Sequence, residues 1–405
     1  MKQRILLSTV LILAAYILSK SVIKESLFQS PASETLQKCI PPEFDSNYSR
    51  DAEIRITPSP DSTIIPVGWE IISTIPESMQ GIYATIELVR PQSEYDEIWF
   101  FVYADNDIHA DVKDYRPINY LIYRTDTKQW RQAPPPPSDW KLVLDPNNNV
   151  WSPSVYESGP QLYRLDEFAN SFVPIVDKNN ELAKWGIKNS VKVAPNGLFW
   201  IVLQGPNWEN NLLMSFDPVT LETTLHLEGM DIYDVTIDKA GNIYLLHTND
   251  EPFVSMEYIS PYTLTKYDPV TGRTDSVEIP LTEDEYGGYT NLYVDRENRL
   301  WVSDIAWIDI TGSEIGERHF IPRSPIFVHY VNYLTQYVWS RPRINLESID
   351  GRLWYEFEQG AVWYKPDKKE WCWFARGLTS GPIEDSEHNL WMMVDSTLYK
   401  LQMTP

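Results

Sequence analysis

The sequence predicts an all-β protein, a seven-bladed β-propeller made of four-stranded antiparallel blades. Two short motifs recur in step along most of the chain, about every 49 residues. Helical periodicity is nearly absent after residue 40. The hydrophobic share of 43% and the aromatic share of 13% are enough for a large core. A period of this length indicates propeller blades, because a small sheet buries both of its faces only by stacking against its neighbours.

The first motif is a turn rich in Asp, Asn and Gly, followed by an aliphatic residue and then an aromatic one. Its seven copies end at Trp99, Trp151, Trp200, Tyr244, Trp301, Trp354 and Trp391. Large flat side chains suit the space between packed sheets. We therefore expect these aromatic residues to fill the gaps between blades.

The second motif is a strand that ends in an aromatic residue and leads into a turn. Its seven copies end at Tyr123, Tyr163, Phe216, Tyr267, Tyr330, Tyr364 and Tyr399. Asp-Pro follows directly in two of them, as Asp217-Pro218 and Asp268-Pro269, which is favourable chemistry for starting a turn. The two motifs together place the second and third strands of each blade.

The propeller is expected to occupy residues 63–405, with the ring closed by its own first strand. Blade 4 is the clearest unit, with strands expected at 232–237, 243–247, 263–267 and 274–279. The last unit has no fourth strand after 397–401, and an open ring would leave an exposed sheet edge. Residues 69–75 have the pattern of an outer strand and are expected to supply the missing one.

Residues 1–24 have the layout of a signal peptide or a membrane anchor helix. Lys2 and Arg4 precede an apolar run, and the stretch 5–23 is just long enough to span a bilayer. Both interpretations place the body of the protein outside the cytoplasm, whether secreted, periplasmic or anchored on the outer side. Residues 25–62 are rich in Pro and Ser and are expected to form a linker or stalk with little regular structure.

The chain has two cysteines, Cys39 and Cys372. In an exported protein they could form one disulfide that attaches the stalk to blade 6. The alternative is two unpaired cysteines, one buried and one in the stalk.

Composition excludes several classes of partner. The chain has 34 Lys and Arg against 57 Asp and Glu, a formal charge of −23. This argues against binding to nucleic acid or to an anionic membrane surface, since both depend on clustered cations. No metal-ligand spacing, phosphate-binding loop or serine nucleophile motif is present. We therefore expect a monomer without a cofactor; calcium in the loop Asp105–Asp111 is an alternative.

The repeat resembles known families of propellers. Gly241-Asn242-Ile243-Tyr244, followed by Tyr267-Asp268-Pro269-Val270-Thr271-Gly272, resembles the two-component regulator propeller repeat. It is also similar to the NHL, streptogramin-lyase and gluconolactonase propellers. The first resemblance implies an extracytoplasmic sensor domain. The lyase resemblance implies a catalytic His near the central channel, and the gluconolactonase resemblance a metal held by Glu, Asn and Asp. No motif of these enzymes can be matched residue by residue, so no catalytic residue is assigned.

A ligand site is expected where strand A begins and strand B ends, because both lie on the same face of a propeller. Long B–C loops at 104–119, 248–262 and 304–324 are expected to crowd this face, whereas blades 6 and 7 have tight turns there. A binding cleft is therefore predicted at the rim of blades 4 and 5. Its candidate ligand-binding residues are Gln204, Asp231, His247, Tyr289, Asp304, Trp307, Asn345, Glu358 and Asp395. The alternative is that these are solvated rim residues.

Two functions remain open at this point. The first is an extracytoplasmic binding or sensing module that recognises a protein or carbohydrate ligand without catalysis. The second is a metal-dependent hydrolase or lyase at the channel mouth, based on the acidic candidates and His247. A purely structural surface protein is a third possibility.

Overall fold

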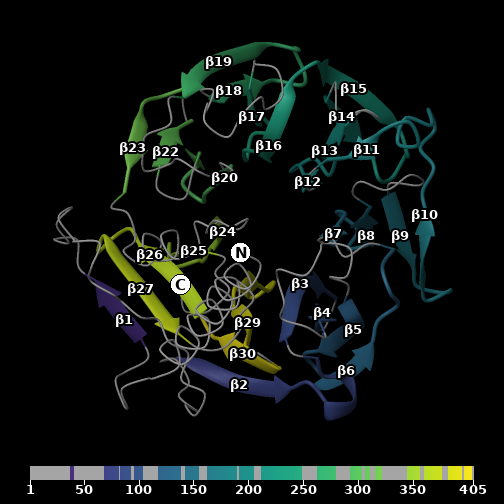
Figure 1. The fold of residues 1–405 in the computed structure, drawn as a ribbon, viewed down its shortest axis with the longest axis vertical. Coiled ribbons are helices and arrows are strands. Elements are labelled where there is room, and N and C mark those ends of the chain that lie inside the picture. Colours follow the sequence, from purple (N-terminus) through teal and green to yellow (C-terminus); the bar gives the residue numbers. More distant parts are fainter. Residues whose placement is uncertain are drawn as a thin grey trace, which may run out of the picture.

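The fold is a ring of seven antiparallel sheets, one for each blade (Figure 1). The structure is a computed structural model. It describes residues 37–40 and 68–403, except 82, 93–94, 104–116, 138–141, 155–161, 189–190, 205–210, 249–261, 280–291, 303–305, 311–314, 322–343, 356–359, 376–381 and 395. The predicted all-β seven-bladed propeller is confirmed. The described residues contain no α-helix, only a short 3-10 helix at Glu77–Met79, and the expected N-terminal helix lies outside them.

The blades follow one another along the chain, each with its first strand innermost. Blade 1 is formed by β3 (Tyr83–Pro91), β4 (Asp96–Tyr103), β5 (Pro117–Arg124) and β6 (Gln129–Gln132). Blade 2 is formed by β7 (Val143–Leu144), β8 (Val150–Pro153), β9 (Leu162–Asp166) and β10 (Ser171–Pro174). Blade 3 is formed by β11 (Gly186–Ile187), β12 (Lys192–Val193), β13 (Phe199–Gln204), β14 (Leu212–Phe216) and β15 (Thr223–Glu228).

The second half of the ring repeats this order. Blade 4 is formed by β16 (Asp231–Ile237), β17 (Ile243–Thr248), β18 (Tyr262–Tyr267) and β19 (Thr274–Ile279). Blade 5 is formed by β20 (Tyr293–Val294), β21 (Arg299–Trp301), β22 (Ala306–Asp309) and β23 (Arg318–Phe320). Blade 6 is formed by β24 (Ile344–Glu347), β25 (Leu353–Tyr355), β26 (Gly360–Lys365) and β27 (Glu370–Ala375). Blade 7 contains β28 (Ile383–Glu384), β29 (Leu390–Val394) and β30 (Thr397–Leu401).

The ring is closed as the sequence predicts. Strand β2 (Trp69–Thr74) pairs with β30 and becomes the outer strand of blade 7. Trp69 lies opposite Leu401, is buried, and packs edge-on against Trp354 of blade 6 at 6.0 Å between ring centroids. The first and last strands of the propeller therefore lie in one sheet, which leaves no gap between the first and last blades.

A second N-terminal strand differs from the prediction. Residues 37–40, expected to belong to a linker without regular structure, form β1 (Gln37–Ile40), which pairs with β27 as a fifth strand of blade 6. Cys39 lies directly opposite Cys372 in this pairing. Cys372 is disulfide-bonded, and Cys39 is the only other cysteine of the chain. The strand was not apparent in the sequence because four residues are too few to show a period.

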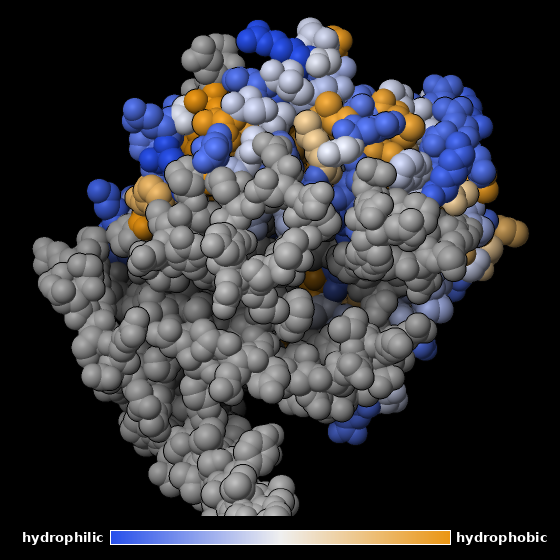
Figure 2. All heavy atoms as spheres, turned by 45° about the horizontal axis from the view of Figure 1, so that its top comes forward, coloured by the Kyte–Doolittle hydropathy of each residue, from blue (hydrophilic) through white to orange (hydrophobic). Residues whose placement is uncertain are grey.

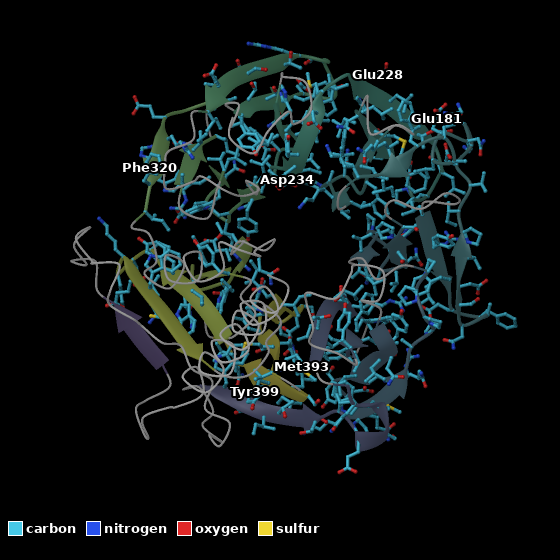
Figure 3. The ribbon with its side chains drawn as sticks, in the orientation of Figure 1. Glu181, Glu228, Asp234, Phe320, Met393 and Tyr399 are labelled. Atoms are coloured by element: carbon cyan, nitrogen blue, oxygen red, sulfur yellow. The ribbon has the colours of Figure 1, made fainter. Side chains whose placement is uncertain are left out.

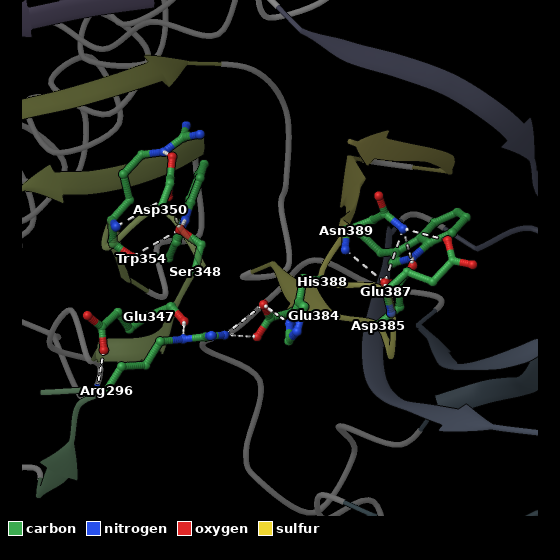
Figure 4. A network of polar contacts seen from close by, with 12 residues as sticks. Arg296, Glu347, Ser348, Asp350, Trp354, Glu384, Asp385, Glu387, His388 and Asn389 are labelled. Carbon is green, nitrogen blue, oxygen red and sulfur yellow. Dashed lines mark hydrogen bonds and ion pairs between the residues drawn. The ribbon is translucent and has the colours of Figure 1, made fainter. Parts of the chain in front are cut away.

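A buried aspartate organises the turn between the first two strands of most blades. In blade 7, Asp385 Oδ1 accepts the backbone N–H groups of Glu387 at 2.9 Å and Asn389 at 2.8 Å (Figure 4). Its Oδ2 accepts the indole N–H of Trp391 at 2.7 Å. We call this arrangement the aspartate clamp. It recurs around Asp145, Asp238 and Asp295, each of which bonds to the aromatic residue six positions later.

The clamp explains both the spacing and the composition of the first sequence motif. The aromatic residue must follow the aspartate by six positions because its N–H or O–H reaches back to the carboxylate. The fourth residue of each turn has a positive φ, for example 87° at Gly241 and 63° at Asn298, a conformation that favours Gly and Asn. In blade 6, Ser348 takes the place of the aspartate and its Oγ accepts the indole N–H of Trp354 at 3.0 Å.

Blade 3 lacks the clamp, because Ala194 stands in place of the aspartate. Its aromatic residue, Trp200, instead packs on His226 with 4.6 Å between ring centroids. The two ring nitrogens of His226 bond to Ser215 Oγ and to Tyr267 Oη, both at 2.9 Å. Burial lowers the pKa of His226. A neutral histidine therefore joins blade 3 to blade 4.

The spaces between the blades hold the core, as the sequence predicts. The motif tryptophans are nearly inaccessible to solvent; Trp151, for instance, packs with Phe199 of blade 3 at 5.4 Å between ring centroids. Each of seven buried apolar clusters includes side chains from two adjacent blades. Stacking the blades therefore removes the faces of neighbouring sheets from water together.

Polar contacts also link the blades, most clearly around Arg296 in the first turn of blade 5 (Figure 4). Its Nε donates to the backbone oxygen of Glu347 in blade 6 at 3.0 Å, and its Nη2 contacts both carboxylate oxygens of Glu384 in blade 7, at 2.6 and 2.7 Å. Lys239 of blade 4 donates to the backbone oxygen of Arg296. One arginine therefore connects four consecutive blades.

Replacing the buried aspartate of blade 4 should destabilise the ring. Asp238→Ala leaves the backbone N–H groups of Ala240 and Asn242 and the hydroxyl of Tyr244 without their acceptor. We expect the free energy of unfolding to fall by about 3 kcal/mol, measured by urea denaturation. The matched control is Asp268→Ala in the same blade, because Asp268 is only partly buried and also accepts three hydrogen bonds. Equal losses in both variants would contradict the role of the clamp.

The disulfide predicts a defined thiol count. The unfolded protein should show no free thiol before reduction. It should show two free thiols after reduction. Reduction, or the change Cys372→Ser, should lower stability by about 2–4 kcal/mol because the unfolded chain gains freedom. Thermal melts with and without reductant measure this, and the Cys372→Ser variant should no longer respond to reductant. A free thiol in the unreduced protein would disprove the pairing.

The buried histidine predicts acid sensitivity. Because the folded-state pKa of His226 lies below its ordinary value of about 6.5, the unfolded chain takes up a proton first as pH falls. The contribution of His226 to stability is therefore complete above about pH 6.5 and is lost below it. Thermal melts between pH 7.5 and pH 5 should show a steeper decline for the wild-type protein than for His226→Gln. Parallel declines would count against this assignment.

Candidate functional site

The start of strand A and the end of strand B share one face of the ring, as predicted. In blade 4, Asp231 begins β16 and lies opposite Thr248, which ends β17. The connections between the second and third strands also lie on this face. Those of blades 1 and 4, residues 104–116 and 249–261, are among the longer ones, as expected, and both lie outside the described residues.

The predicted long loop of blade 5 is wrong. Strands β21 and β22 are joined by a tight turn in which Val302 N–H donates to the oxygen of Ala306 at 3.0 Å. The sequence analysis placed the third strand at Tyr330, but Trp307, opposite Trp301, belongs to that strand. Tyr330 lies outside the described residues. The segment expected as one long loop, 304–324, therefore contains β22 and β23.

Trp307 consequently packs within blade 5, as part of strand β22. It stacks on His319 at 4.2 Å between ring centroids, with the guanidinium of Arg299 at 5.2 Å from its ring. It also contacts the apolar cluster between blades 5 and 6. Trp307 is a packing residue here rather than a loop aromatic presented to a ligand.

Three other candidates take part in internal contacts. His247 is buried in β17, and its Nε2 lies 2.8 Å from Thr265 Oγ1 on the neighbouring strand. Gln204, the last residue of β13, is buried opposite Gly186. Asn345 sits at a register shift in β24 and donates to the oxygen of Pro382 at 2.6 Å, which links blades 6 and 7. Tyr289, Asp304, Glu358, Asp395 and the loop Asp105–Asp111 lie outside the described residues.

Asp231 is the candidate around which polar groups converge. Its Oδ1 accepts the ammonium of Lys188 at 2.7 Å and the side-chain amide of Asn211 at 2.8 Å. Lys188 follows β11 and is fixed by its own N–H, which donates to the oxygen of Val202 at 2.9 Å. Asn211 directly precedes β14, and its backbone oxygen accepts the N–H of Gly229 at 3.1 Å, which fixes its position. Blades 3 and 4 together thus build a polar site, called here the Asp231 site.

Among the residues that the structure describes, one atom of the Asp231 site has no hydrogen-bond partner. Asn211 is 3% exposed, and its Oδ1 is buried without a donor. The orientation of this amide is determined, because its nitrogen must face the carboxylate of Asp231. A buried acceptor without a partner costs about 1–3 kcal/mol. A hydrogen-bond donor from water or from a ligand would offset this cost.

Two tyrosines border the site. Tyr233 occupies a bulge in β16, where the pairing with β17 shifts by one residue, and bulges often redirect side chains beside functional sites. Its ring lies 5.3 Å from Lys188 Nζ and meets Tyr262 edge-on at 5.2 Å between centroids. The next residue, Asp234, lies at the inner end of blade 4, next to the axis of the ring (Figure 3).

The charges of the site favour a neutral polar ligand. Lys188 neutralises Asp231, so the site lacks the excess negative charge that a cation prefers, and the ammonium itself repels one. Across the part of the chain that the structure describes, no group of three or more His, Cys, Asp or Glu side chains could hold a metal ion. The sequence analysis identified Asp231 but missed Lys188, Asn211 and Tyr233. Lys188 directly follows β11, and only the pairing of β11 with β13 shows that this part of the chain lies on the inner side of blade 3.

Several solved structures are similar to this one, at low sequence identity. The structure is similar to the extracellular domain of a hybrid two-component system from B. thetaiotaomicron, with 11% identity and a TM-score of 0.49, over 84% of this chain and 41% of that chain. It is also similar to a gluconolactonase from Xanthomonas campestris, with 10% identity and a TM-score of 0.41, over 83% and 89% of the two chains. A third similar structure is regucalcin, a calcium-binding protein from Agrobacterium tumefaciens, with 11% identity and a TM-score of 0.38, over 82% and 92%.

This chain therefore spans less than half of the two-component protein's chain. No protein-family model and no curated protein sequence matches it. The class of protein that fold and site define is a seven-bladed β-propeller, the fold that the resemblance of the repeat implied. The described residues contain no helix that is long and apolar enough to cross a membrane; the apolar segment 5–23 lies outside them.

Proposed function

We propose that the protein is an extracytoplasmic binding module that recognises a protein or glycan ligand at the Asp231 site. The observation that supports this proposal is the buried side-chain oxygen of Asn211, which has no donor among the described residues and lies beside the Lys188–Asp231 ion pair. A hydroxyl or amide group of a ligand could donate to Asn211 and accept from Lys188. Both proteins and glycans present such groups.

The cysteine pair supports the location outside the cytoplasm. Structural disulfides persist in oxidising compartments and are rare in the cytosol. Cys372 is disulfide-bonded, and the N-terminal sequence has the layout of an export signal. Two independent features thus favour an exported protein.

The alternative function, a metal-dependent hydrolase or lyase, has no comparable observation in its favour among the described residues. Asp231 is engaged by Lys188, and the Nε2 of His247 by Thr265. Among the described residues, no second carboxylate is placed with either of them as such a mechanism requires. We therefore argue only for the binding function.

The proposal predicts a specific loss of binding. The wild-type protein should bind at least one component of a glycan array or of an extracellular protein pull-down. Asn211→Leu removes the acceptor at similar volume and should weaken that binding at least tenfold, measured by calorimetry on the isolated ligand. The control Asn179→Leu alters an amide on the outer side of blade 3, which donates to Thr223. Equal affinity of the wild-type protein and Asn211→Leu would contradict the assignment of the site.

A further inference from the structure

The outermost strand of each blade presents one unpaired edge, and most blades protect it. An unpaired edge offers a row of N–H and C=O groups to any other chain. The outer strands β6 and β10 have four residues each, and β23 has three. In blades 3 and 7 the pairing of the outer strand is broken by a register shift. Short or bulged edges accept an added strand poorly.

Two outer strands lack these protections, β19 and β27. Each has six residues and pairs with its inner neighbour in an unbroken register. The edge of β27 is covered by β1, which the disulfide of Cys372 secures. Strand β19 ends its sheet, so no strand within the described residues covers it. Blade 6 therefore shows that an outer edge of this ring accepts a fifth strand, and blade 4 offers an edge of the same length.

The composition of β19 indicates which kind of strand it would accept. It carries Asp275 and Glu278 but no Lys, the residue that commonly protects exposed edges. Val277 lies between them and is 38% exposed. Figure 1 shows β19 along the outside of blade 4, followed by β23 of blade 5. On this side of the ring, apolar patches lie among polar ones (Figure 2). Phe320 of β23 is an exposed apolar side chain.

Charge complementarity then defines the partner. Asp275 and Glu278 make the edge acidic, in a chain with a formal charge of −23. Opposite charges on paired strands stabilise the pairing, and like charges oppose it. An acidic strand would therefore be repelled, whereas Lys or Arg would be attracted. Strand β1, which covers the equivalent edge of blade 6, itself carries Lys38.

We propose that the outer edge of β19 binds an extended segment of a partner protein as a fifth strand of blade 4. The partner segment carries Lys or Arg next to Asp275 and Glu278 and an apolar side chain next to Val277. Backbone hydrogen bonds along the edge supply affinity, and the alternating side chains supply selectivity. This surface is separate from the Asp231 site, and its test does not depend on the proposed function.

A ten-residue peptide with Lys-Val-Thr-Lys at its centre serves as the probe for the full-length protein, because Asp275 and Val277 lie on one face of the strand and Glu278 on the other. Fluorescence anisotropy measures its binding, and hydrogen exchange with mass spectrometry locates it. We expect binding in the micromolar to submillimolar range and slower exchange of the amides in 274–279. A peptide with Asp in place of Lys should bind at least tenfold more weakly. Absence of binding at 1 mM, or protection elsewhere than in β19, would overturn the proposal.

Reversing the charge of the β19 edge is the second test of the proposal. The double change Asp275→Lys and Glu278→Lys should weaken binding of the Lys peptide at least tenfold and improve binding of the Asp peptide. The control changes Glu70→Lys and Glu228→Lys, which lie exposed on β2 and β15, alter the net charge equally on other outer strands. Thermal melts establish that both double variants are folded. If the control pair reduced binding as much as the β19 pair, the attraction would be general and not specific to this edge.

Discussion

The hydrogen bond from a motif aromatic residue to a buried aspartate six positions earlier is the constraint on which four of the seven blades depend. The carboxylates of Asp145, Asp238, Asp295 and Asp385 are nearly inaccessible to water, so each must receive several donors to compensate for lost hydration. The turn supplies backbone N–H groups, and the aromatic residue supplies the last donor. That bond also fixes the indole or phenol ring in the space between two blades. Local turn geometry and packing between blades are therefore set by one group.

Blade 3 shows what happens where this constraint is absent. With Ala194 in place of the aspartate, the histidine His226 joins blade 3 to blade 4 through Ser215 and Tyr267. The inner edge of this blade consists of two short strands, β11 and β12, which both pair with β13. Lys188 follows β11, donates its N–H to Val202 of β13, and lies beside Asp231. Blade 3, which departs from the repeat in this way, contributes Lys188 and Asn211 to the Asp231 site.

The candidate site was only partly predictable for reasons that individual residues make clear. Asp231 was identified because the start of an inner strand can be read from the repeat. Asn211 and Lys188 were missed because their proximity to Asp231 follows from the stacking of two blades, which no local pattern records. Trp307 was assigned to a loop because the aromatic–turn pattern matches both Trp307 and Tyr330. Pairing with Trp301 selects the first of them, and pairing is a tertiary property.

The sequence by itself determined the number of blades, the closure of the ring by residues 69–74 and the burial of the motif aromatics. These three features can be predicted from the sequence because each depends on the spacing of residues within one repeat or on the number of strands along the chain. Only the tertiary structure decided which polar groups meet between blades, that β1 covers the edge of β27, and that the edge of β19 carries no described strand. These features depend on contacts between segments far apart in the chain. Such contacts are set by how the blades pack against one another and leave no periodic trace in the order of residues.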